Sequence, residues 1–292
     1  MEQFGIDFQS LGIQLTVFGF SLTFRYYGIL LMSGAVAAAY LTGRLLKSER
    51  KDPDIAWDGL IWVLIFGVIG ARLYHVLTPS ISTVDLGKDV GYFLTNPLEI
   101  LNIPAGGLGI PGAIIGGLFG AYLFSRRRKI GFGSLIDAAA PGLALAQAIG
   151  RWGNYVNQEL YGLPTTLPWG IRIDPRNRLR GYESFERFHP LFLYESILNF
   201  INFLILMWFW RNKRDKLKDG DIFLIYLVMY PLQRFLLEYL RLDYVEIGPG
   251  TNLNQLLALG VALGAGIALY VRNRPGPEKE QQKRRRSRRR VG

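Results

Sequence analysis

Stretches of about twenty mostly apolar residues recur along the chain and limit what it can fold into. A membrane-spanning helix needs roughly 20 such residues. Seven stretches approach or exceed this length, at residues 26–43, 55–77, 100–125, 134–150, 190–210, 220–240 and 247–271. Three of them carry no charge, and the other four place ionisable residues at membrane depth. The sequence therefore predicts an all-α polytopic membrane protein with seven transmembrane helices.

Lysine and arginine cluster on alternate connections between these stretches. They gather after the first, third and fifth stretches, as at Arg126–Lys129, and again beyond residue 271. Because such connections stay in the cytoplasm, we expect the N-terminus outside and the C-terminus inside. We predict one integral-membrane domain over 1–272, an extracytoplasmic arm or head at about 151–188, and a disordered basic cytoplasmic tail over 273–292.

The amino-acid composition limits which reactive groups the chain itself can supply. Half of the residues are hydrophobic, the net charge is +11, and there is no cysteine, so a reacting thiol has to come from a partner. A basic tail can bind nucleic acid, but directly after a span it more often contacts anionic lipids. We therefore expect membrane lipids and no nucleic acid as partners. The two histidines and scattered carboxylates show no metal-ligand spacing, so no metal or cofactor is expected.

A dense polar stretch, GRWGNYVNQELYG at 150–162, follows the fourth apolar run. Arg151 offers five donors in a planar fork that suits a phosphate or a carboxylate. Asn154 comes one helical turn later, so both side chains face one spot if the helix continues. Asn157 and Glu159 add further polar groups. A glycine-containing helix end with a solvated loop would give the same pattern.

Charged residues inside the spans need partners, because burying one at the bilayer centre costs roughly 2.5–3.5 kcal/mol. Tyr230, Arg234 and Glu238 are spaced four residues apart and Arg241 follows, so all four lie near one helical face. A structural ion pair between Arg234 and Glu238 explains this spacing as well as a substrate site does. Glu195, near the start of the fifth span, also needs a partner.

Residues 150–162 resemble the signature of the bacterial prolipoprotein diacylglyceryl transferases, G-R-x-G-N-[FY]-x-N-x-E-[LIVM]-[WYF]-G, at every defined position. The resemblance covers nearly the whole chain, from Tyr27 to Gln255. Other segments are similar to patterns of the same family, namely Tyr27-Gly28, Arg72 in GARLYHV, His189-Pro190 with Tyr194-Glu195, and the Tyr-x-x-x-Arg-x-x-x-Glu spacing at 230–238.

This resemblance implies transfer of the diacylglyceryl group from phosphatidylglycerol to the lipobox cysteine of a prolipoprotein. The products would be a thioether-linked lipoprotein precursor and glycerol phosphate, and the location would be the bacterial cytoplasmic (inner) membrane. The implied partners are phosphatidylglycerol and prolipoprotein signal peptides with a lipobox cysteine.

The reaction suggests roles for the polar residues. Cations aimed at the leaving phosphate would favour the transition state, and we expect this of Arg151 and Arg234, with Asn154 and Tyr27 hydrogen-bonding the phosphate or the glycerol. The candidate catalytic residues are Arg151, Arg234, Tyr27, Glu238 and His75. The candidate substrate-binding residues are Arg151, Asn154, Asn157, Glu159, Arg72, Tyr230, Arg241 and Glu195.

One position departs from the family pattern. The family's third span often reads G-G-[ML]-x-x-H-G-G, with its histidine assigned as a base, whereas this chain has Pro111 there. The base role then falls to His75, Tyr27, Glu238 or Glu159, of which His75 has the most suitable intrinsic pKa. Our hypothesis is that a positive site instead raises the thiolate fraction of the incoming cysteine, whose free pKa is about 8.5.

Two other classes of protein share these features. A polytopic transporter or lipid flippase also places arginines and glutamates inside a bundle, but it would be expected to show repeated halves, and no repeat is evident. A structural membrane scaffold would use the same charges as pairs between helices. An alanine substitution at Arg151 separates these classes, because only a transferase loses lipid transfer while it stays folded.

Overall fold

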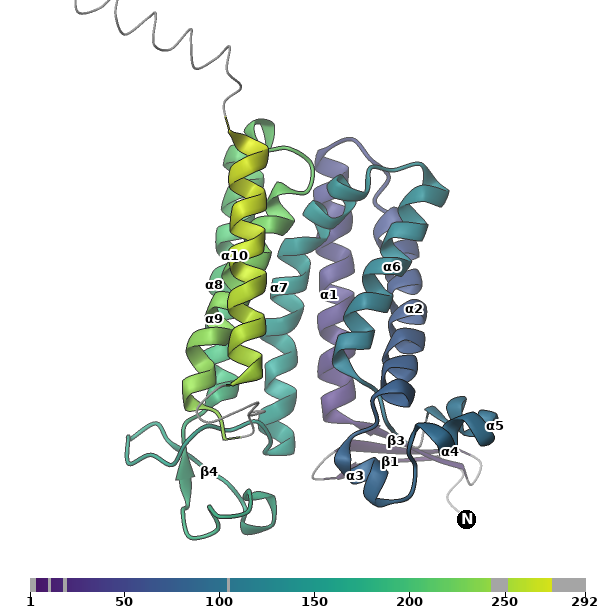
Figure 1. Ribbon diagram of the computed structural model, residues 1–292, viewed down its shortest axis with the longest axis vertical. Coiled ribbons are helices and arrows are strands. Elements are labelled where there is room, and N and C mark those ends of the chain that lie inside the picture. The colour runs from purple at the N-terminus through teal and green to yellow at the C-terminus, as the bar shows by residue number, and fades with distance from the viewer. Residues whose placement is uncertain (1–3, 10–11, 18–19, 104–105, 243–251, 275–292) are drawn as a thin grey trace, which may run out of the picture.

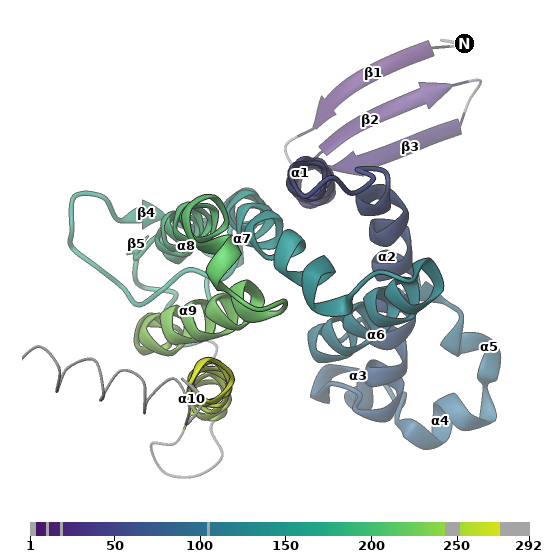
Figure 2. The same ribbon diagram turned by 90° about the horizontal axis from the view of Figure 1, so that it is seen from above.

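The computed structural model describes residues 4–9, 12–17, 20–103, 106–242 and 252–274, and most of them are helical. The long helices of the described residues run roughly side by side in Figure 1. They are α1 (Tyr26–Ser48), α2 (Ile55–Leu77), α6 (Ile110–Arg128), α7 (Phe132–Asn157), α8 (Leu191–Lys213), α9 (Asp221–Leu237) and α10 (Leu253–Asn273). Seen from above, α7 to α10 gather on one side and α2 with α6 on the other, with α1 next to α7 (Figure 2).

In the part of the chain that the structure describes, six helices are long and apolar enough to cross a membrane. The remaining long helix, α6, has 19 residues and ends in three arginines, and it falls outside this set. Length and composition thus confirm the prediction of a mostly helical, multi-pass membrane protein.

The predicted stretches and the helices differ mainly at their ends. Residues 55–77 coincide with α2, but the stretch predicted from residue 100 becomes a continuous long helix only at Ile110. Gly106 and Gly107 interrupt it, because their φ angles of 89° and 74° are left-handed. Pro111 then lies in the first turn of α6, where a missing N–H is tolerated. The predicted tail falls almost wholly outside the described residues.

The prediction of an all-α protein missed a sheet at the N-terminus. Strands β1 (Phe4–Gln9), β2 (Gly12–Val17) and β3 (Phe20–Arg25) form a three-stranded antiparallel sheet that leads directly into α1. The sequence FSLTFR alternates apolar and polar residues, which is the period of a strand. This pattern is only six residues long, much shorter than the apolar runs of about twenty residues from which the helices are predicted. The sheet lies at one end of the bundle, and the short helices α3 (Ile81–Asp85), α4 (Val90–Thr95) and α5 (Pro97–Ile100) lie at the same end (Figure 1), on the other side of the molecule from the sheet (Figure 2).

The segment between α7 and α8 folds around its own small core at that same end of the bundle (Figure 1). Its strands β4 (Ile171–Arg172) and β5 (Arg187–Phe188) pair antiparallel. Tyr161, Ile173 and Phe188 are buried together. The Tyr161 hydroxyl accepts from the Leu179 backbone N–H at 2.6 Å. Of the segment predicted as an arm, residues 151–157 instead belong to α7.

Glycines let α2 and α6 approach closely. Gly112, Gly116 and Gly120 lie one turn apart on α6 and face the backbone of α2. A Cβ on Gly112 would overlap the Gly70 carbonyl oxygen and the Tyr74 Cβ, and one on Gly120 would come within 2.7 Å of the Trp62 carbonyl oxygen. Small residues at such contacts are how membrane helices gain close packing.

Replacing Gly112 with alanine is expected to destabilise the protein by about 1–3 kcal/mol, because the added methyl group forces two helix backbones apart. The midpoint of thermal denaturation in detergent, followed by tryptophan fluorescence, measures this. Gly260→Ala is the matched control, since a Cβ at this exposed position of α10 meets nothing within 4 Å. Equal midpoints for the two variants would contradict close packing of α2 on α6.

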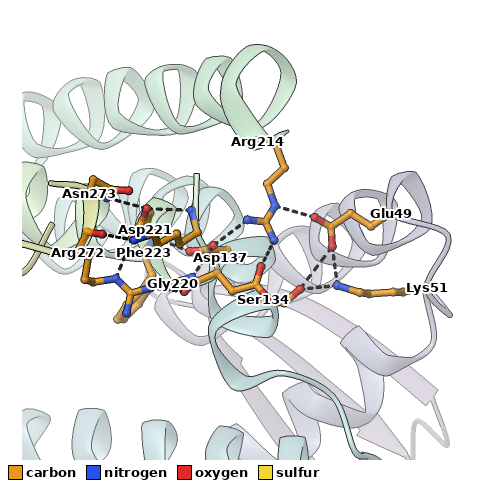
Figure 3. A network of polar contacts seen from close by, with 12 residues as sticks. Glu49, Lys51, Ser134, Asp137, Arg214, Gly220, Asp221, Phe223, Arg272 and Asn273 are labelled. Atoms are coloured by element: carbon orange, nitrogen blue, oxygen red, sulfur yellow. Dashed lines mark hydrogen bonds and ion pairs between the residues drawn. The ribbon is translucent and has the colours of Figure 1, made fainter. Parts of the chain in front are cut away.

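A polar network ties the helix ends together at the opposite end of the bundle (Figure 3). The Arg214 guanidinium contacts Glu49 at 2.6 Å, Asp137 at 3.3 Å and Asp219 at 2.6 Å. The pKa of Glu49 lies below its ordinary value: burial raises it, but the hydrogen bonds from Lys51 and Arg214 outweigh that effect. These contacts join the end of α1, the start of α7 and the connection between α8 and α9.

The same network holds the first turn of α9. Asp137 is fully buried and accepts the backbone N–H groups of Gly220 at 2.7 Å and Phe223 at 2.8 Å. Its carboxylate therefore caps the N-terminus of α9, where a negative charge is favourable. Asp221 in turn accepts from Arg272 at 3.1 Å and from Asn273 at 2.9 Å, which attaches the end of α10.

Candidate active site

The polar end of α7 carries Arg151 and Asn154 on one helical face. The helix continues through both residues and ends only at Gln158, whose φ of 51° is left-handed. The Nη1 of Arg151 donates to the Asn154 side-chain oxygen at 3.2 Å. Gly153 on this turn lies against the ring of Tyr27 from α1, which a Cβ would approach to within 2.6 Å. Tyr27 thus packs directly on the turn that bears both polar residues.

Glu159 continues the polar chain after α7 ends. Its Oε1 accepts from Asn154 at 2.9 Å and from Asn157 at 3.3 Å. Asn154 is buried, and both its side-chain oxygen and its side-chain nitrogen have hydrogen-bond partners within residues 150–162. Arg151, Asn154, Asn157 and Glu159 therefore form one connected group.

The last residues of the stretch join it to the end of α9. The Gly162 N–H donates to the His189 carbonyl oxygen at 2.9 Å, and the Leu163 N–H donates to that of Leu240 at 2.9 Å. Gly162 also pairs with Arg241 in an antiparallel bridge. A Cβ on Gly162 would come within 2.9 Å of His189 and of the Leu240 backbone, so only glycine fits without a shift. This pairing places Arg241 beside the stretch.

Glu195 and the arginines around it form a charged centre between three helices, called the Glu195 centre below. Its side chain is 3% exposed, and its two oxygens lie 2.5 Å from Arg151 Nε and 2.5 Å from Arg234 Nη1. Arg241 Nη1 lies 3.9 Å away. The partners come from α7, from α9 and from the segment after α9, while Glu195 is in the second turn of α8. One buried carboxylate therefore holds two arginines that are 83 residues apart in the sequence.

Glu238 forms a second centre next to the first. Its side chain is 1% exposed and lies 3.2 Å from Arg234 and 3.5 Å from Arg241. The side-chain amides of Asn254 and Asn252 donate to its Oε1 at 2.8 Å and 3.4 Å. These five charged residues, three arginines and two glutamates, leave one excess positive charge.

Asn252 and Asn254 were not among the residues predicted for the site. Asn252 also caps α10 by accepting from the backbone N–H groups of Asn254 and Gln255. An asparagine directly before an apolar run is a typical helix start, and that signal is visible in the sequence. Nothing in the sequence indicates that the same turn reaches Glu238.

Two predicted residues lie in another part of the structure. Arg72 is buried and donates to four backbone carbonyl oxygens, those of Glu99 at 2.5 Å, Ile100 at 2.8 Å, Gly106 at 2.7 Å and Gly107 at 3.1 Å. His75 packs edge-on against Phe93 and beside Gly107. Within the described part of the chain, neither residue has a polar contact with the Glu195 centre.

Tyr230 completes the predicted set. Its ring stacks on Tyr226, with centroids 5.6 Å apart and planes at 11°. The Tyr226 hydroxyl accepts from Gln147 at 2.9 Å, which joins α9 to α7. Tyr230 lies one turn before Arg234 on α9, toward the interior of the bundle from the Glu195 centre. Of the predicted residues, the contacts described above bring Arg151, Asn154, Glu159, Glu195 and Arg234 into one polar cluster.

Comparison with known proteins matches this chain to one family. The model of the family described as prolipoprotein diacylglyceryl transferase matches residues 15–272. Curated relatives with the name phosphatidylglycerol–prolipoprotein diacylglyceryl transferase include one from Frankia alni, 41% identical over 252 residues, and one from a Nostoc species, 40% identical over 263 residues. A third, from Chloroflexus aggregans, is 35% identical over 282 residues.

The relatives differ in length. The alignments cover 86%, 88% and 90% of this chain in the same order, and 64%, 89% and 89% of the relatives. The chain therefore spans less than two thirds of the Frankia alni protein and most of the other two.

Proposed function

Because the chain belongs to the prolipoprotein diacylglyceryl transferase family, we propose that it transfers diacylglyceryl from phosphatidylglycerol to the lipobox cysteine of prolipoproteins. A thioether forms at the cysteine and glycerol phosphate leaves, which is the first step of lipoprotein maturation. The observation that carries this proposal is the position of Arg151 and Arg234. They come from different helices and meet at one buried carboxylate, Glu195.

The charge of the cluster suits this reaction. Phosphatidylglycerol has a phosphodiester with one negative charge, and cleavage of its carbon–oxygen bond leaves a phosphate monoester that carries more. Fixed cations aimed at that developing charge stabilise the transition state more than the bound lipid. Glu195 and Glu238 hold the guanidinium groups in place before substrate arrives, so little reorganisation is needed. Asn154 and Tyr27 are the proposed hydrogen-bonding partners of the phosphate or the glycerol.

The nucleophile is the cysteine thiol of the incoming prolipoprotein. With Pro111 in place of a family histidine, we propose that the guanidinium groups of Arg151, Arg234 and Arg241 favour the thiolate without a dedicated base. His75 is the alternative base, and its position beside Gly107 puts it next to the segment where that family histidine occurs.

Replacing His75 with glutamine is expected to keep activity within about tenfold of wild type, less than the 100- to 10,000-fold that a general base contributes. The pH–rate profile should keep the same limbs, because neither limb then reports the titration of His75. His75→Gln and wild type are compared in phosphatidylglycerol vesicles with a lipobox peptide. Loss of nearly all activity, with loss of one limb of the profile, would assign the base role to His75.

We further propose seven spans, with the N-terminus outside and the C-terminus in the cytoplasm of a bacterial inner membrane. Helix α6 lies beside α2 and parallel to the other long helices, which supports its role as the additional span (Figure 1). The network around Arg214 joins the connections after α1 and α8 to the last turn of α10 at one end of the bundle. These connections are rich in lysine and arginine, as cytoplasmic ones are.

The test is an assay of the purified protein in phosphatidylglycerol vesicles. A lipobox peptide with cysteine should gain the mass of a diacylglyceryl group, and the same peptide with serine should not. A flippase would move phosphatidylglycerol between leaflets without changing the peptide, and a structural scaffold would do neither. Either of these two outcomes would overturn the proposed function.

A further inference from the structure

A groove lies between α2 and α6 at the end of the bundle away from the Glu195 centre. It has a volume of about 500 Å³ and is lined by Asp58, Ile61, Trp62, Phe124, Arg127 and Arg128. It is formed by the first two turns of α2 and the last turn of α6. Helix α2 begins here and α6 ends here, on the side of the basic connections. The groove therefore lies where a bilayer surface would be.

One side of the groove is apolar. Trp62 and Phe124 pack with ring centroids 6.1 Å apart, and Ile61 is exposed beside them. Phe124 is buried and forms the floor, where Gly59 leaves room for its ring: a Cβ there would be 3.2 Å from Phe124 Cε1. Tryptophan at this depth is typical of the membrane interface.

The other side of the groove is cationic. Arg128 forms an ion pair with Asp58 and lies over the Phe124 ring at 6.0 Å. Arg127 is exposed and makes no ion pair or hydrogen bond with any residue that the structure describes. With Asp58 balanced by Arg128, the groove has one excess positive charge, on Arg127.

We propose that this groove binds one anionic glycerophospholipid, whose phosphate contacts Arg127 and Arg128 while an acyl chain begins along Ile61 and Trp62. A headgroup with one negative charge matches the one excess positive charge. A zwitterionic phosphatidylcholine headgroup does not, and a soluble anion does not use the apolar side. Polybasic segments beside membrane helices attract anionic lipids in general; here the aromatic floor adds a place for the chain. The proposal requires only a membrane protein and does not depend on transferase activity.

Quenching of Trp62 fluorescence tests this site directly, because Trp62 lines the groove. The full-length protein is placed in vesicles whose lipids are brominated near the headgroup end of one acyl chain. The quenched signal is compared between wild type and Trp62→Phe, so that the difference belongs to Trp62 alone. We expect this difference to be about twofold or more larger with brominated phosphatidylglycerol than with brominated phosphatidylcholine.

Two double variants supply the matched comparison. Arg127→Gln with Arg128→Gln should abolish the preference for phosphatidylglycerol. Lys47→Gln with Arg211→Gln removes the same charge from exposed positions at the same end of the bundle and should keep the preference. Each variant is also made with Trp62→Phe, and thermal denaturation verifies that both are folded.

Three results would overturn the proposal. The first is equal quenching by the two brominated lipids in wild type, and the second is equal loss of preference in both double variants. The third is relief of the phosphatidylglycerol quenching by soluble glycerol phosphate, which would identify a site for free phosphate rather than for lipid.

Discussion

Replacing Arg151 with alanine is expected to lower the rate of diacylglyceryl transfer by roughly 100- to 1,000-fold, the usual effect of losing one transition-state donor. The variant should remain folded, because Glu195 keeps Arg234 at 2.5 Å and Arg241 at 3.9 Å as partners. The measurement is the initial rate of peptide modification in phosphatidylglycerol vesicles, with the denaturation midpoint recorded on the same preparation.

Two further variants sharpen this experiment. Arg151→Lys keeps the charge but not the planar fork that contacts Glu195 and Asn154, so it should recover only part of the rate. Arg211→Ala removes an exposed arginine from the far end of α8 and should leave the rate unchanged. A folded Arg151→Ala protein with the wild-type rate would show that this guanidinium does not act on the leaving phosphate.

Replacing Glu195 with alanine is expected to destabilise the protein by about 3–5 kcal/mol, the usual effect of removing one partner from a buried ion pair. Three guanidinium groups from α7 and the end of α9 would then face one another with Glu238 as the remaining carboxylate among them. The denaturation midpoint in detergent should fall by roughly 10 °C.

Glu186→Ala is the matched control for this loss, because Glu186 is an exposed carboxylate on the segment that precedes α8. Its midpoint should stay close to that of wild type. Glu195→Gln keeps the volume and some hydrogen bonding but not the charge, so it should fall between the two. If Glu195→Ala denatured at the wild-type temperature, the carboxylate would not be what holds Arg151 and Arg234 together.

Helical spacing was enough to predict parts of this cluster. Asn154 lies one turn after Arg151, and Glu238 lies one turn after Arg234, so each pair shares a face of its own helix. The positions 55–77 of α2 also followed from apolar length alone. The need of Glu195 for a partner followed from the high cost of a lone charge in a membrane. Contacts within one helix and costs of burial are local properties, and the sequence contains them.

Contacts between helices were harder to predict from the sequence. Arg72 was predicted to bind substrate, but in the structure its guanidinium donates to carbonyl oxygens of residues 99–107. The contacts of Asn252 and Asn254 with Glu238 depend on how α10 is rotated against α9. That rotation is set by packing over the whole helix pair, and no short motif encodes it. The N-terminal sheet was missed for a different reason, since its alternation of residues is present but short.

Helix α9 is fastened at both ends, by Asp137 at its first turn and by Glu195 and Glu238 at its last. Because both ends of α9 are held by buried carboxylates, a change in its tilt would break hydrogen bonds or ion pairs at one of them. Between α1 and α7 the backbones also lie close together, because a Cβ on Gly34 would come within 3.0 Å of the Ala146 carbonyl oxygen and one on Gly142 within 2.8 Å of that of Ala38. This contact reaches Tyr27, whose ring lies against Gly153 on the turn that bears Arg151 and Asn154, so a shift of α1 along α7 would move that ring relative to both polar residues.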